Sequence, residues 1–200
     1  MLLGHTSGIF GSSSTPTTPS GSTRTPTMQT PEEILTLTGK RTNAPGKAFS
    51  CSSTNYVLLG LILERVTGVA LADLVHDRLL VPLGLDQTMF QQAGRPNGLV
   101  GAKGFWKERG RLSGVVRRHR LQHTSTATVA WATGAIEGSV REPARLGDGA
   151  LRGVTMATSD ALAQMLDFDR KSGYGLGART QTVAKRAGYG TAARCVGSCR

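Results

Sequence analysis

Residues 45–68 read PGKAFSCSSTNYVLLGLILERVTG, and this stretch carries the clearest structural pattern of the chain. The opening Pro-Gly pair predicts a turn, because proline fixes φ and glycine permits the bend. After a short extended crossing, apolar residues at helical spacing predict a helix that Thr54 or Asn55 caps, that runs to about Thr67 and that ends at Gly68. Because apolar side chains occupy most of its circumference, we expect this helix to be buried on most sides.

Two further segments flank this helix in the sequence. Residues 2–8 read LLGHTSG, and residues 79–88 read LLVPLGLDQT. In order and spacing, the three segments resemble the serine β-lactamase and D-alanyl-D-alanine carboxypeptidase family, whose members are also described as penicillin-binding-protein-like. AWATG at residues 130–134 and YGLG at residues 174–177 are weaker similarities to the same family. The chain is thus identified as a truncated and degenerate member.

The resemblance implies an α/β (α+β) fold of the β-lactamase/transpeptidase type, of which this chain forms a mostly helical, loop-rich partial domain. We expect three stretches within it. Residues 1–29 hold the family turn and a flexible loop of Ser, Thr and Pro, and residues 30–90 hold the helical part. Residues 91–200 are a basic, Gly- and Arg-rich remainder of the same domain.

Three catalytic elements are typical of the family: Ser-x-x-Lys, Tyr-x-Asn, and Lys- or His-x-Gly on a sheet edge. No Ser-x-x-Lys occurs in these 200 residues, and the positions of Tyr-x-Asn read Cys51-Ser52-Ser53. The nearest candidate for the third element is Gly188-Tyr189-Gly190. A thiol is shorter than a phenol, and a hydroxyl makes fewer hydrogen bonds than a carboxamide. Cys51, Ser53 and Tyr189 are therefore altered motif positions, and none of them is predicted to be catalytic.

Intact relatives are implied to cleave small β-lactam, peptide or ester substrates through an acyl-serine. Without the serine and its lysine, we expect the present chain to be inactive. The resemblance implies no cofactor or metal, and Cys195 and Cys199 lack a second pair or a nearby histidine that would favour zinc. Relatives are usually exported, but Met1–His5 has neither the basic start nor the apolar length of a signal peptide, so the localisation stays open. No apolar run is long enough to span a membrane.

A basic stretch offers an interpretation from a different class of protein. The net charge of +11 lies almost wholly in the second half, where 17 Lys and Arg face 7 Asp and Glu. Residues 103–120 concentrate this charge and include Phe105 and Trp106, which is typical of a module that binds nucleic acid or acidic surfaces. No known nucleic-acid-binding signature accompanies them, so we expect any such binding to be adventitious. An amino-acid sequence rich in Arg, Gly and Ala is also typical of a GC-rich gene read out of frame.

Local patterns predict three more helices. Thr30 caps a short helix that opens with Pro31, residues 69–80 form an amphipathic helix, and residues 159–166 form another. Among isolated residues, His5 and Tyr56 are expected to be structural, and Ser7 does not lie in a Gly-x-Ser-x-Gly elbow.

No sequence feature places His76, His119 or His123 beside Cys51, so we expect Cys51 to be an ordinary half-buried cysteine. The odd count of three cysteines predicts no disulfide framework.

Overall fold

The computed structural model describes residues 1–11, 30–36, 38–90, 105–108, 111–115, 131–139, 141–152, 158–183 and 185–190. In these ranges the helices are α1 (Pro31–Thr36), α2 (Ser53–Thr67), α3 (Leu71–Val75), the π-helix η1 (His76–Leu80), the 3₁₀-helix η4 (Trp131–Thr133), α5 (Glu142–Leu151) and α6 (Ser159–Met165). The strands are β1 (Met89–Phe90), β2 (Phe105–Glu108), β3 (Arg111–Val115), β4 (Ile136–Glu137), β5 (Arg179–Val183) and β6 (Arg186–Gly190).

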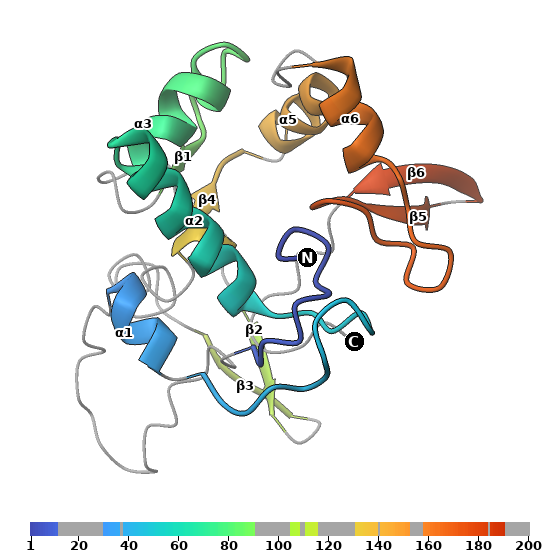
Figure 1. Cartoon of the computed structure of the whole chain (residues 1–200). Helices are drawn as coiled ribbons and strands as arrows, with labels where there is room; N and C mark the ends of the chain where they lie inside the picture. The colour runs from blue at the N-terminus through green and yellow to red at the C-terminus, as the bar shows by residue number, and fades with distance from the viewer. Residues whose placement is uncertain are drawn as a thin grey trace.

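The described strands form three separate antiparallel pairs, which join β1 to β4, β2 to β3, and β5 to β6. In β5 and β6 the register places Thr180 opposite Tyr189. Figure 1 shows α2 running through the middle of the molecule, with α1 on one side and α5, α6 and the β5–β6 hairpin on the other. The N-terminal turn lies near the beginning of α2, and this arrangement forms the candidate site.

Helix α2 ends where the sequence predicts and begins earlier. Gly68 adopts a left-handed conformation with φ 70°, and its N–H donates to the Glu64 carbonyl at 2.8 Å, which closes the helix. The predicted cap at Thr54 or Asn55 is wrong, because the N-cap is Ser52, whose side chain makes no capping bond, and the helix begins at Ser53. The side chains of Thr54 and Asn55 are instead hydrogen-bonded to the N-terminal segment.

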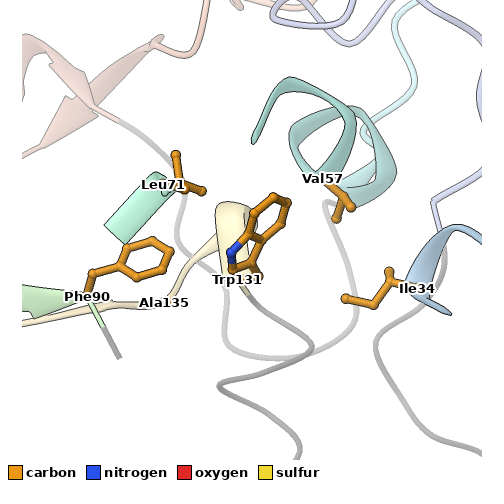
Figure 2. Packing of buried hydrophobic residues seen from close by; sticks show 6 residues of the cluster. All are labelled: Ile34, Val57, Leu71, Phe90, Trp131 and Ala135. Atoms are coloured by element: carbon orange, nitrogen blue, oxygen red, sulfur yellow. The ribbon is translucent and has the colours of Figure 1, made fainter. Parts of the chain in front are cut away.

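A small apolar core forms where α2 meets η4. Figure 2 shows the buried residues of this cluster, which are Ile34, Val57, Leu71, Phe90, Trp131 and Ala135. Gly60 permits the close packing, because a Cβ at this position would lie 2.8 Å from the Trp131 ring and from Ala132. The core therefore links α1, α2, α3, β1 and η4 through side chains that are distant in sequence.

The prediction that α2 is buried on most sides is wrong. Val57 is fully buried, but Ile62, Leu63 and Val66 are 48%, 47% and 79% exposed. These three residues follow the i, i+1, i+4 spacing of one helix face. The described elements cover the side of α2 that faces Trp131 and Ile34 but leave the apolar face formed by these three residues open.

The other predicted helices are present with shifted ends. Thr30 and Glu33 form a reciprocal capping box before α1, since the Thr30 N–H donates to Glu33 Oε2 at 2.9 Å and the Glu33 N–H donates to Thr30 Oγ1 at 3.2 Å. The helix expected over residues 69–80 is α3 followed by η1, and the one expected over residues 159–166 is α6.

Helix α5 and the β2–β3 hairpin were not expected from the sequence. The sequence of α5, EPARLGDGAL, contains one proline and two glycines, so its local helix propensity is weak. Long-range bonds hold its first residue, because the buried Glu142 carboxylate accepts from the Gln87 N–H at 2.9 Å and from the Thr88 hydroxyl. A tertiary contact therefore sets where this helix begins.

Candidate functional site

The segment Cys51-Ser52-Ser53, which the sequence predicts to be an altered family motif, lies at the beginning of α2, where the N-terminal turn packs against it. The Ser50 N–H donates to the His5 carbonyl at 2.8 Å, and the Gly46 N–H donates to the Thr6 carbonyl at 2.6 Å. The Thr54 hydroxyl donates to the Phe10 carbonyl at 3.0 Å. Segments that are more than 35 residues apart are thus joined by two backbone bonds and one side-chain bond.

The His5 imidazole lies at the centre of this contact and is only 5% exposed. Its Nδ1 lies 3.2 Å from the Ser52 backbone nitrogen and 3.2 Å from Asn55 Nδ2. Both partners are N–H donors, so Nδ1 accepts twice and the proton of the neutral ring is on Nε2. Burial lowers the pKa of His5 below its usual value, which favours this neutral form.

Asn55 connects the imidazole to the turn that carries it. Its side chain is fully buried, and the Ser7 hydroxyl donates to Asn55 Oδ1 at 2.6 Å. The amide therefore uses its oxygen on Ser7 and its nitrogen on His5. In contrast, the buried Ser52 hydroxyl has no hydrogen-bond partner within the described part of the chain.

Three aromatic rings surround the imidazole. The ring centroids of Phe49, Tyr56 and Tyr174 lie 5.9, 5.2 and 5.1 Å from that of His5. The Tyr56 hydroxyl lies 3.4 Å from the Leu3 carbonyl and 3.3 Å from the Tyr174 hydroxyl. Burial and the Tyr174 contact raise the pKa of Tyr56 far above its usual range, so its phenol stays neutral. Because the carbonyl can only accept, Tyr56 donates to Leu3 and accepts from Tyr174.

Of the three predicted motif positions, the structure brings two to this cluster. Cys51 is half-buried as expected, and its Sγ lies 3.9 Å from His5 Nε2. However, this sulfur is part of a disulfide bond, so the expectation of an ordinary cysteine is corrected. Ser53 is partly buried at the first position of α2.

Tyr189 lies elsewhere, on β6. Its ring is 56% exposed and stacks on Phe168 with a centroid distance of 5.4 Å. The described hydrogen bonds and ring contacts of Tyr189 do not reach Cys51 or Ser53. No local pattern in the sequence indicates that His5 and Tyr174 meet beside Cys51. The contact of His5 with Cys51 spans 46 residues, and that of Tyr174 with Tyr56 spans 118. Cys195, Cys199, His119 and His123 lie outside the described residues.

Within the described ranges, no three His, Cys, Asp or Glu side chains are grouped so as to hold a metal ion. The helices that the structure describes also include none with the length and apolar character needed to cross a membrane. What the site offers chemically is a neutral imidazole with a protonated Nε2, the neutral Tyr56 phenol bonded to the Tyr174 hydroxyl, and a disulfide sulfur.

Comparison with known proteins identifies the family. The Beta-lactamase family model matches residues 1–194, so this chain belongs to the β-lactamase family. A D-stereospecific amidohydrolase from a Streptomyces species has a similar structure, with a TM-score of 0.77 and 24% identity over 95% of this chain. The D-amino acid amidase of Ochrobactrum anthropi SV3, complexed with D-phenylalanine, has a TM-score of 0.75 and 21% identity over 95% of this chain. The predicted fold of the β-lactamase/transpeptidase type is thereby confirmed.

A third relative is similar over a shorter stretch. Penicillin-binding protein 4 of Amycolatopsis lactamdurans is 47% identical over 45 residues, which are 22% of this chain and 12% of that protein. The present chain spans 58% of the amidohydrolase and 56% of the amidase, so it corresponds to little more than half of either structure.

Proposed function

We propose that this chain is a β-lactamase-related scaffold that does not carry out the acyl-serine hydrolysis of its intact relatives. The observation that carries this proposal is the site at the beginning of α2. There the backbone at the positions predicted to be the second family motif is bonded to His5, while the side chains read Cys51, Ser52 and Ser53.

The groups around that site are also unsuited to activate a nucleophile. A general base needs an atom with a free lone pair and a pKa close to the operating pH. Nδ1 of His5 accepts two hydrogen bonds, its Nε2 carries the proton, and the Tyr56 phenol is neutral. The Cys51 sulfur is in a disulfide and cannot relay a proton as the family phenol would.

Turnover of a chromogenic β-lactam, a nitrophenyl ester and D-amino acid amides tests the proposal. The amides are included because two structural relatives are a D-stereospecific amidohydrolase and a D-amino acid amidase. The unmodified chain and the Cys51→Tyr, Ser53→Asn double variant are both expected to give no turnover. Nucleophile and activating base act as a unit, so restoring one motif recovers little.

The positive control is a chimera of the double variant that also carries the Ser-x-x-Lys and His-x-Gly segments of a relative. We expect hydrolysis, and covalent labelling by a fluorescent penicillin, from this chimera alone. Turnover by the unmodified chain above a heat-inactivated sample would overturn the proposal and make Cys51 the first residue to replace.

A second candidate function is a non-enzymatic basic module that binds nucleic acid or acidic surfaces through residues 103–120. Part of this stretch forms the β2–β3 hairpin, in which the only acid, Glu108, stands opposite Arg111. Binding of a DNA oligonucleotide measured across salt concentrations tests it. Neutralising Arg117, Arg118 and Arg120 together should weaken binding and reduce the salt slope by about 0.9 for each lost phosphate contact. Unchanged binding would exclude this stretch as the nucleic-acid surface.

A further inference from the structure

We propose that His5 is the positioning residue of the motif at residues 51–53, and that its protonation in mild acid releases this segment from the N-terminal turn. The inference rests on the proposed function only in treating residues 51–53 as the second family motif. It concerns how the site is held together, and it requires no catalytic turnover.

The first step of the argument is the bond that His5 makes to the motif itself. Nδ1 accepts the backbone N–H of Ser52, the middle residue of the motif, and the His5 carbonyl accepts the N–H of Ser50 just before it. One residue therefore holds both sides of Cys51 by backbone groups. Because both donors are main-chain N–H groups, these bonds do not depend on the side chains at positions 51 and 53.

The second step is that the imidazole can do this only when neutral. Protonation would turn Nδ1 from an acceptor into a donor. Its new N–H would then face the N–H groups of Ser52 and Asn55, whose nitrogen atoms lie 3.2 Å from Nδ1. Both acceptor bonds would be lost, and buried donors would remain without partners. Burial further disfavours the charged ring and lowers the pKa of His5.

The third step concerns the groups that face the ring from each packed element. Phe49 approaches from the preceding loop, Tyr56 from α2 and Tyr174 from the segment before β5. The Cys51 sulfur lies near Nε2 and does not titrate. No carboxylate of the described residues is paired with His5, so no ion pair in that part of the chain would stabilise the imidazolium.

The direction of the pH effect follows from these contacts. The pKa of His5 in the folded chain is below the value of 6.5 for an unperturbed histidine. As the pH falls through 6.5, the unfolded or released segment binds a proton before the folded site does, which favours release. The loss continues down to the folded-state pKa and is absent above pH 7.5, where both states are neutral.

The test measures the hydrogen-exchange protection factor of the Ser52 amide between pH 7.5 and pH 5, in the full chain and three variants. In the unmodified chain we expect this factor to fall, by tenfold for each pH unit between 6.5 and the folded-state pKa. His5→Asn retains an acceptor oxygen near the Nδ1 position and tolerates φ 54°, so it should keep high protection that no longer depends on pH. His5→Leu has no acceptor and should lose protection at every pH.

The matched control is His76→Asn, which removes an exposed histidine on η1 and should behave as the unmodified chain. The tautomer gives an independent measurement, since the ¹⁵N shifts of His5 should show a proton on Nε2 at pH 7.5. A proton on Nδ1, or equal pH dependence in the unmodified chain and His5→Asn, would overturn the inference. None of these measurements involves hydrolysis, so a failure here is distinct from a failure of the proposed function.

Discussion

At residue 60, helix α2 has no side chain, and the Trp131 ring fills the space where one would be. A Cβ there would lie 2.8 Å from ring atoms and from the Ala132 methyl group, a separation that packed atoms do not tolerate. The core of this chain thus depends on the absence of one methyl group at the crossing of α2 and η4.

Gly60→Ala should therefore lower the free energy of unfolding by about 1–3 kcal/mol, even though alanine is the better helix former. Gly147→Ala is the matched control, because Gly147 lies in α5 with no atom within 4 Å of the added Cβ. The control should be neutral or stabilising by up to about 1 kcal/mol. Urea denaturation measures the free energy of unfolding of both variants. Equal changes in the two would mean that the Trp131 contact does not restrict the side chain at position 60.

Asn55 is the other residue on which the site depends. Asn55→Ala would leave the Ser7 hydroxyl and one acceptor bond of His5 without their partner, at a cost of about 1–3 kcal/mol. The comparison is Gln164→Ala, which removes an exposed amide from α6 and should change stability by less than about 0.5 kcal/mol. A midpoint of thermal unfolding that is equal in the two variants would contradict the importance of the buried amide.

At the scale of elements, helices with good local signals and helices without them are stabilised differently. Thr158 caps α6 by accepting from the Ala161 N–H at 3.1 Å, and Thr30 with Glu33 caps α1. Helix α5 has no side-chain cap of its own, and its first residue, Glu142, is bonded to the loop before β1. Its position therefore depends on a contact that spans 55 residues.

Glu142→Gln should weaken this contact selectively. The amide keeps one acceptor oxygen but places an NH₂ group near the Gln87 N–H or the Thr88 hydroxyl, so we expect a loss of about 1–3 kcal/mol. Hydrogen exchange should increase in α5 and at Gln87, with little change in α6. Glu32→Gln, an exposed change in the first turn of α1, should leave both regions unchanged. Unaltered exchange in α5 after Glu142→Gln would show that other contacts hold the helix.

At the scale of the whole molecule, an open apolar face and a large net charge act in opposite directions. Ile62, Leu63 and Val66 expose aliphatic surface on one side of α2, which favours association and dye binding. A net charge of +11 disfavours association by mutual repulsion between chains.

Val66→Lys should reduce the fluorescence of a bound hydrophobic dye such as anilinonaphthalene sulfonate, because it interrupts the open face of α2. The added lysine lies in the last turn of the helix, where a cation is favourable, so folding should be retained. Val81→Lys adds the same charge at another exposed valine and should leave dye binding unchanged. A similar decrease in both variants would point to charge rather than to this face.

The sequence by itself determined the elements whose signals are local. Caps and turn residues lie within a few positions of the backbone groups that they satisfy, so Thr30, Gly68 and the spacing of residues 159–166 identified α1, the end of α2 and α6. The three family segments also determined the fold class, because their order is a property of the chain alone. Helix α5 escaped this reasoning, since its own residues are poor helix formers.

The chemical character of the site depends on tertiary contacts. The tautomer of His5, the proximity of Cys51 to its Nε2 and the phenol pair of Tyr56 and Tyr174 arise from contacts across 46 to 118 residues. Whether the apolar face of α2 is open or covered likewise depends on which segments pack against it. The spacing of its apolar residues would be the same in either case. Burial, protonation and partner choice depend on what surrounds a side chain in space, and a local pattern carries no information about those neighbours.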